Sequence, residues 1–333
     1  MQISTIWSVY FSATGVTERV VSAVADAAAE ALCGTEQENL SGRPDRKDPS
    51  VSRERRPQRK MLCFNPPDVR QKPLIFGKND LVILGVPVYA GRVPNLLLPY
   101  LKENVKGGVT PAVAVVTYGN RNFDDALAEL CGIMEENGFY IAAAGAFVGE
   151  HAFSRVLGAG RPDEADLSLA EMLGRRAAEF LLKGLSFSVS GPDCATVPAP
   201  VRERVPVSVH VPGHYPPGPY YTPRDRNGNP IDIRKVKPKV DERKCMRCGL
   251  CAVLCPLGSI DIDNVTEVTG ICMKCGACVK KCPSGARYFD DPGYLYHKSE
   301  LEEIYARRAE SRIFSEIPEN PDEEKMQKET EPE

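Results

Sequence analysis

Apolar side chains occur in short runs along the first half of the chain, and helix-forming stretches lie between them. The runs are rich in β-branched and aromatic residues and have the length of strands. They lie at residues 3–11, near 61–64, and at 81–86, 111–118 and 140–148. Continuously apolar strands that alternate with helices are typical of a parallel sheet covered on both faces. Residues 1–185 are therefore predicted to form an α/β domain with a doubly wound parallel sheet.

Several segments interrupt this pattern and suggest further boundaries. Residues 41–60 carry eight basic and three acidic side chains, a net charge of +5, and almost no apolar ones. They are predicted to be a disordered insertion. A solvated loop is the simplest interpretation, with a dock for an acidic redox partner and nucleic-acid contact as alternatives. Residues 186–240 are rich in proline, which favours an extended and fairly stiff interdomain linker.

The end of the chain reads as a helix followed by a tail. The stretch SELEEIYARRAESRIF, residues 299–314, is predicted to be a helix that follows the cysteine repeat, at the end of a second domain over residues 241–312. Residues 313–333 are predicted to be an acidic disordered tail, since 316–333 alone carry a net charge of −6.

The length and net charge of the chain limit the class of protein to which it can belong. A chain of 333 residues is long enough for two domains, and the formal net charge of −3 indicates no global attraction to nucleic acid or membranes. The first residues do not resemble a signal peptide, and no apolar run approaches the roughly 20 residues of a membrane helix. A cytoplasmic location is expected, where thiols stay reduced and clustered cysteines favour metal binding over disulfides.

Eight of the 12 cysteines occur in two copies of the pattern C-x2-C-x2-C-x3-C-P, separated by 27 positions. The copies are CMRCGLCAVLCP and CMKCGACVKKCP, and glycines after them repeat with the same offset. In two-cluster ferredoxins the fourth cysteine of such a run binds the other cluster. Cluster one is then predicted to take Cys245, Cys248, Cys251 and Cys282, and cluster two to take Cys272, Cys275, Cys278 and Cys255. Structural zinc and a disulfide framework are the alternatives, but structural zinc more often uses two separated C-x2-C pairs.

A second candidate site lies near the start of the chain. The turn SATGVT, Ser12 to Thr17, joins the first strand to a helix, and backbone N–H groups at such a helix start can bind an anion. Two later strands end in loops that hold Tyr89 and Tyr118, the second followed by Gly119. Parallel strands present these loops at one edge of the sheet, where such folds bind ligands. The combination suits a flat aromatic ring that carries a phosphate.

These motifs resemble those of a known family. Residues 1–185 resemble a flavodoxin domain, in which S/T-x-T-G-x-T after the first strand holds the phosphate of FMN. The whole chain is similar to flavodoxin–ferredoxin fusion proteins of anaerobic microbes, and the resemblance implies that residues 241–312 form a small α+β ferredoxin domain with two [4Fe-4S] clusters. The resemblance implies two [4Fe-4S] clusters and FMN as cofactors. It assigns the phosphate to Ser12, Thr14, Gly15 and Thr17, and the flavin ring to Tyr89, Tyr118 and Gly119; packing at the strand ends is the alternative for the tyrosines.

Some positions depart from that pattern. Val16 stands where many flavodoxins have asparagine, and Arg92 and Arg121 lie in loops that are often acidic in flavodoxins. A cation beside the ring would favour the anionic reduced flavin. Glu150 and His151 follow the last strand and are candidates for contact with flavin or for proton transfer, or else are structural.

Three functions remain open from the sequence. The first is an electron-transfer protein that relays electrons between redox partner proteins, the two clusters and FMN. The second is a reductase, an FMN- and iron–sulfur-dependent oxidoreductase whose clusters supply electrons to a small substrate. The third is a ferredoxin whose flavodoxin-like domain holds no flavin and serves for docking. Neither nucleic acid nor a membrane is an expected partner.

Overall fold

A six-stranded sheet forms the centre of the first domain. The computed structural model describes residues 2–40, 56–183 and 209–315. The strands lie in the order β10-β7-β6-β4-β1-β2. Their bounds are β1 Thr5–Tyr10, β2 Gln58–Cys63, β4 Asp80–Pro87, β6 Thr110–Tyr118, β7 Phe139–Val148 and β10 Arg312–Phe314. The first five strands of the chain in this sheet are parallel and lie in the order 2-1-3-4-5, which is the flavodoxin-like order.

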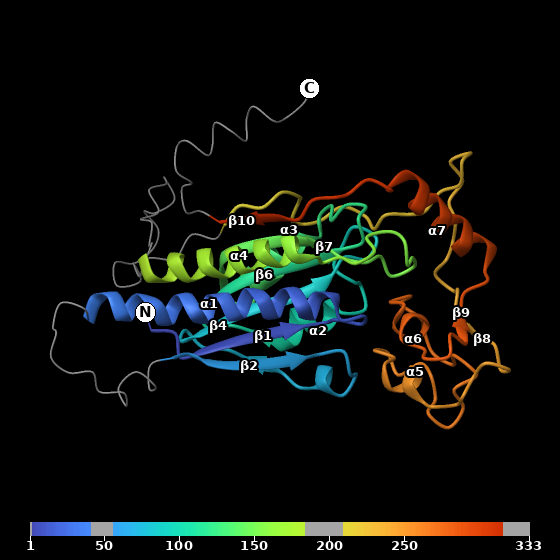
Figure 1. Cartoon of the computed structure of the whole chain (residues 1–333), viewed down its shortest axis with the longest axis horizontal. Helices are drawn as coiled ribbons and strands as arrows, with labels where there is room; N and C mark the ends of the chain where they lie inside the picture. Colours follow the sequence, from blue (N-terminus) through green and yellow to red (C-terminus); the bar gives the residue numbers. More distant parts are fainter. Residues whose placement is uncertain (1, 41–55, 184–208, 316–333) are drawn as a thin grey trace.

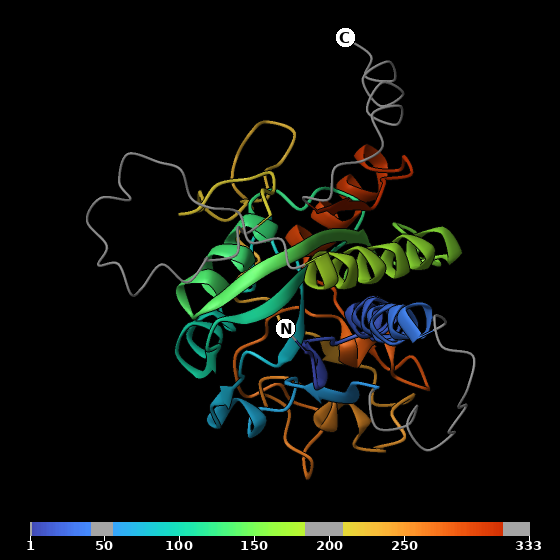
Figure 2. The same ribbon diagram turned by 90° about the vertical axis from the view of Figure 1, so that its left-hand side faces the viewer.

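Helices cover both faces of this sheet. Helices α1, Val16–Leu40, and α4, Glu164–Lys183, lie side by side on one face (Figure 2). They approach so closely that a Cβ atom at Gly174 would come within 2.1 Å of the Val24 carbonyl oxygen. Helices α2, Leu98–Asn104, and α3, Ala126–Glu136, contribute to the core on the other face. Every position of β6 and β7 is buried, which explains why these strands are continuously apolar. The predicted α/β parallel fold is confirmed.

Short elements complete this domain. A 3-10 helix spans Val69–Gln71, and the two-residue strands β3, Leu74–Ile75, and β5, Val105–Lys106, pair in a separate small sheet. Strand β2 begins at Gln58, so the last residues of the predicted insertion belong to the sheet. Residues 41–55 of that insertion lie outside the described residues.

The segment before the cysteine repeat runs over the first domain. Residues 184–208 lie outside the described part, and from Val209 the chain is bonded to this domain at several points. The Val209 N–H donates to the Ile141 carbonyl at 3.0 Å, and the Tyr220 hydroxyl donates to the Val93 carbonyl at 2.8 Å. The ring of Tyr215 fills the space over Gly132 in α3, where a Cβ atom would lie 2.4 Å from it. These contacts tie the described part of the linker to β7, to α3 and to the loop after β4.

The second domain contains short elements around the cysteine repeat. Strands β8, Lys239–Val240, and β9, Arg287–Tyr288, form an antiparallel pair. Helices α5, Leu250–Val253, and α6, Ala277–Lys280, each follow the second cysteine of a run. In Figure 1 the arrows of the parallel strands of the large sheet point toward α5 and α6. The second domain therefore lies beyond the carboxyl ends of the parallel strands.

The end of the described chain differs from the predicted helix over 299–314. Helix α7 spans Pro292–Ile304, because Asp291 caps its first turn by accepting a hydrogen bond from the Tyr294 N–H, and Pro292 suits a first helical position. Residues 312–314 form β10, which pairs antiparallel with β7. The chain thus returns to the first domain and adds an edge strand to its sheet. Among the described residues no helix is both long enough and apolar enough to span a membrane.

Candidate iron–sulfur and flavin sites

The sequence repeat is also a repeat of backbone conformation. Residues 27 positions apart adopt nearly the same left-handed φ angles: Arg247 at 52° and Lys274 at 57°, Gly249 at 75° and Gly276 at 76°, Gly258 at 60° and Gly285 at 62°. The N–H groups of Ser259 and Ala286 donate to the sulfur atoms of Cys255 and Cys282, both at 3.3 Å. The two halves therefore present their cysteines in matching local geometry.

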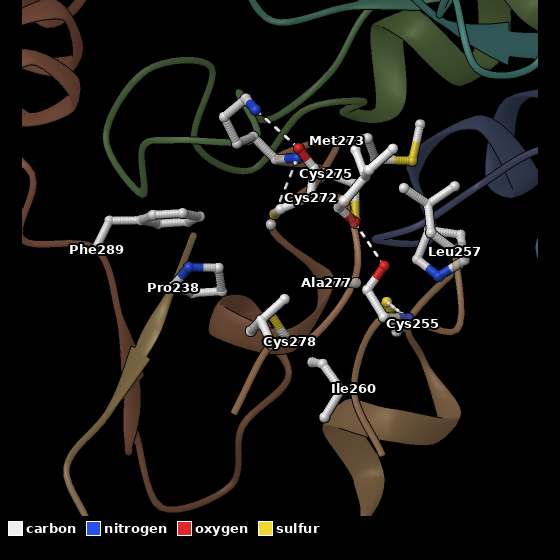
Figure 3. Close-up of a pocket in the computed structure, with 16 residues that line it drawn as sticks. Pro238, Cys255, Leu257, Ile260, Cys272, Met273, Cys275, Ala277, Cys278 and Phe289 are labelled. Carbon is white, nitrogen blue, oxygen red and sulfur yellow. Dashed lines mark hydrogen bonds between the residues drawn. The ribbon is translucent and has the colours of Figure 1, made fainter. Parts of the chain in front are cut away.

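The predicted ligands of cluster two surround one cavity. Cys255 from the first run and Cys272, Cys275 and Cys278 from the second line it together (Figure 3). Its other walls are largely apolar and include Leu257, Ile260, Met273 and Phe289. Four thiols in an apolar cavity, with the Lys274 N–H donating to the Cys272 sulfur at 3.4 Å, fit a [4Fe-4S] cluster, whose sulfur atoms accept such hydrogen bonds.

The predicted ligands of cluster one come from the two runs as well, and Arg287 lies between two of them. Its Nη2 atom donates to the Cys251 sulfur at 3.4 Å. Burial raises the pKa of the Cys282 thiol, but hydrogen bonds from Ser284 and from the backbone of Ala286 and Arg287 outweigh this effect, so the net shift is downward. Arg287 thus contacts one cysteine of each run, while Cys248 is exposed at the surface.

Two buried thiols of the second run, Cys275 and Cys278, favour the protonated form when no metal is bound. Burial is the main cause that raises the pKa of Cys275 and of Cys278 to about 12. Iron binding supplies the positive charge that stabilises the thiolates. Among the described residues no three candidate ligands converge on a single metal ion. A cubane does not need such convergence, because each of its cysteines binds a different iron.

The turn from Ser12 to Thr17 is formed as an open anion-binding loop. Helix α1 begins at Val16, and Gly15 has φ of 98°, with no atom within 4 Å of the place that a Cβ atom would take there. The Ser12 hydroxyl accepts a hydrogen bond from the Glu18 N–H at 3.1 Å, which caps the helix. Thr14 remains partly exposed. The backbone at the helix start and the open space over Gly15 fit a phosphate group.

Two neighbours hold this loop in place. The Thr17 hydroxyl is buried and lies 2.7 Å from the Thr117 hydroxyl of β6. The Asn65 side chain bonds both the N–H and the carbonyl of Ser12, at 2.7 and 2.8 Å. Sequence reasoning did not single out Asn65, although its position just after β2 places it at the same edge of the sheet. In this structure Thr17 therefore stabilises the loop through its buried hydroxyl.

The two tyrosines predicted to hold a ring have different surroundings. Tyr118 is 5% exposed, and its hydroxyl donates to the Glu310 carbonyl at 2.7 Å. The adjacent Gly119 is covered by His151, whose ring would lie 2.4 Å from a Cβ atom there. Tyr118 is thus a packing residue in this structure. Tyr89 lies at the ligand edge beside Cys272 and Cys275 of the second cysteine run, and burial raises its pKa well above the usual value.

A conservative change tests the packing role of Tyr118. Tyr118→Phe removes only the hydroxyl that bonds Glu310, so we expect unfolding to become easier by about 1 kcal/mol, with flavin content unchanged. Urea unfolding of the wild-type and variant proteins measures the loss of stability. A fall in flavin content at unchanged stability would instead assign Tyr118 to the cofactor.

The two arginines that depart from the flavodoxin pattern are paired with acids and lie over aromatic rings. Arg92 forms an ion pair with Glu129 at 2.6 Å, and its guanidinium lies 4.6 Å from the ring centre of Tyr220. Arg121 pairs with Asp124 and lies 4.5 Å from the ring centre of Tyr221. Both cations therefore contact the linker, and their charges are compensated there.

The loop after β7 forms one of the contacts between the two domains. Glu150 pairs with Lys280 of α6, whose Nζ atom also donates to the His151 carbonyl at 2.6 Å. A Cβ atom at Gly276 would lie 2.5 Å from the Ala152 carbonyl oxygen, so the second cysteine run packs directly on this loop. Burial, together with the nearby Lys280, lowers the pKa of His151 to about 3. Glu150 and a neutral His151 thus hold the interface in this structure.

Fold and site together define a flavodoxin-like α/β domain joined to a ferredoxin-type domain. The family described as 4Fe-4S binding domain matches residues 238–261 and 266–288. This match supports the predicted ferredoxin part of the chain, and the strand order supports the predicted flavodoxin-like part.

Several solved flavodoxin structures are similar to this chain. One from the domain Archaea is 15% identical, with 53% of this chain and 96% of that chain covered and a TM-score of 0.34. The two-electron reduced Megasphaera elsdenii flavodoxin is 18% identical, with 53% and 99% covered and a TM-score of 0.31. A short-chain flavodoxin associated with a non-canonical PDU bacterial microcompartment is 13% identical, with 55% and 99% covered and a TM-score of 0.32. The strand order, not these scores, carries the assignment of the fold. No curated protein sequence matches the chain.

Proposed function

We propose that this protein transfers electrons between redox partner proteins, two [4Fe-4S] clusters and FMN, in anaerobic redox metabolism. The observation that carries the proposal is the position of the second cysteine run at the carboxyl edge of the parallel sheet. Gly276 lies against Ala152 there, and the thiols of Cys272 and Cys275 lie near Tyr89. Ligands of flavodoxin-like folds bind at this edge.

Different residues of the chain would bind FMN and present a cluster to a partner protein. The loop from Ser12 to Thr17 would hold the phosphate through its backbone N–H groups, and Tyr89, which lies near Cys272 and Cys275, would contact the ring. When bound, FMN would supply a ring that accepts one or two electrons, whereas each cluster passes one at a time. Cys248 is exposed, so cluster one is the end that a partner protein can approach.

A second candidate function follows from the covered loop after β6. Asn120 donates to the carbonyls of Tyr305 and Arg307 at 2.7 and 2.6 Å, and Tyr118 is buried under the same segment. A flavodoxin-like domain closed in this way could serve only to dock the ferredoxin-type domain and its partners. Quantitation of flavin and iron after purification without oxygen separates the two functions.

The relay predicts that cluster reduction leads to flavin reduction within one molecule. Ion pairs and backbone contacts join the domains, so the transfer rate should not depend on protein concentration. Stopped-flow measurement with a limiting one-electron donor would follow cluster bleaching and flavin absorbance across a dilution series. A phase that slows in proportion to dilution would mean that clusters and flavin meet only between molecules, and the relay would be refuted.

A further inference from the structure

The two cluster sites match in cysteine spacing and backbone geometry but differ at one buried position. Ile260 lines the cavity of the cluster-two ligands. The residue 27 positions later, at the equivalent place in the second half of the repeat, is Arg287. Both side chains are buried, at 6% and 3% exposure. One site therefore has an aliphatic side chain where the other has a guanidinium.

The contacts of Arg287 show that its guanidinium is directed toward the cluster-one ligands. Its Nη2 atom donates to the Cys251 sulfur and to the Val265 carbonyl. Its Nε and Nη1 atoms are buried and have no hydrogen-bond partner. Buried donors normally have partners, and an unsatisfied one is costly. Inorganic sulfide and cysteine sulfur of a bound cluster are acceptors that could satisfy them.

We propose that Arg287 raises the reduction potential of cluster one above that of cluster two. This inference rests on the proposed function, because it takes Cys245, Cys248, Cys251 and Cys282 as the ligands of cluster one. Reduction adds one electron, and hence one negative charge, to a cluster. A buried cation in contact with a ligand stabilises the reduced form more than the oxidised form, as do hydrogen bonds to the sulfur atoms.

A difference in reduction potential between the clusters determines which of them holds a single added electron. Cluster two lies at the interface with the first domain, beside Tyr89, whereas cluster one includes the exposed Cys248. A higher potential at cluster one holds a single electron at the exposed end. Transfer from the flavin edge outward is then favourable, and transfer inward requires a donor strong enough to reduce cluster two.

Redox titration of the whole protein, followed by electron paramagnetic resonance, tests the proposal. Arg287→Ile places the repeat's own equivalent residue at this site. We expect the more positive of the two midpoint potentials to fall, and the other to fall less, although the Arg287 charge also acts on the Cys278 thiol. The equilibrium constant for electron transfer from cluster two to cluster one should decrease about tenfold, which is about 59 mV for a one-electron couple. Arg243→Gln, which removes a cation with a 95% exposed side chain two positions before Cys245, should leave both potentials unchanged.

Further variants separate charge from structure. If Arg287→Ile fails to hold about half of the iron, Arg287→Lys and Arg287→Gln are compared, since lysine keeps the charge and glutamine keeps only hydrogen bonding. The proposal predicts a near wild-type potential for lysine and a lower one for glutamine. Equal potentials in these two variants, an unchanged potential in Arg287→Ile, or loss of cluster one in all three would overturn it. Absence of two clusters from the wild-type protein would refute the proposed function instead.

Discussion

Replacing Cys255 with alanine should cost the protein about half of its iron. Two cubanes correspond to about eight irons per chain, and the structure places Cys255 in one cavity with Cys272, Cys275 and Cys278. We therefore expect Cys255→Ala to eliminate cluster two, although Cys255 belongs to the first cysteine run. Iron quantitation of anaerobically purified protein measures the loss. Cys63→Ala, which removes a half-buried thiol outside the two runs, should retain all the iron.

Double variants identify which cluster is lost. Cys255→Ala combined with Cys272→Ala should lose no more iron than either single change, because both residues would bind the same cluster. Cys255→Ala combined with Cys251→Ala should lose nearly all the iron, because each change would remove a different cluster. The reverse pattern, in which the Cys255 and Cys251 changes are not additive, would show that each run binds its own cluster.

Thr14→Asp should abolish FMN binding while the fold remains intact. A carboxylate that stands about 4 Å from a phosphate charge costs about 4 kcal/mol at an effective dielectric constant of about 20. This corresponds to about a thousandfold loss of affinity. The same carboxylate lies near the start of α1, where a negative charge stabilises a helix by about 0.3–1 kcal/mol. The apoprotein should therefore be at least as stable as before.

The matched control for this change is Thr14→Asn, which has nearly the same shape and no charge. Flavin release after mild denaturation, measured by fluorescence, gives the occupancy of each variant. We expect occupancy to be largely kept in Thr14→Asn and lost in Thr14→Asp, with thermal unfolding of the flavin-free proteins alike. Wild-type occupancy in Thr14→Asp would exclude the loop from phosphate binding. No flavin in the wild-type protein would favour the docking function.

Features encoded over short stretches could be predicted from the sequence. Ligand spacing for a cubane depends on a few consecutive residues, and each run of four cysteines contains this information itself. The apolar runs predicted parallel strands, because strands covered on both faces must be apolar throughout. The loop from Ser12 to Thr17 was predicted as an anion site for a similar reason, since a strand end, a glycine and a helix start are contiguous in the chain.

Features that depend on contacts between distant segments could not be predicted from the sequence. The burial of Tyr118 depends on Glu310, which lies 192 positions later, and no local pattern indicates that a returning segment covers the loop after β6. Residues 312–314 became a strand rather than the end of a helix because the edge of β7 offered backbone partners. Arg287 looks like an ordinary surface arginine in CPSGARYFD, and only the folded repeat buries it beside Cys251. The sequence by itself determined the two modules and the cluster ligands to be tested, because these depend on local spacing. The tertiary structure decided which side chains face the domain interface and which set of predicted cluster ligands has a buried cation beside it, because burial and charge pairing depend on residues far apart in the chain.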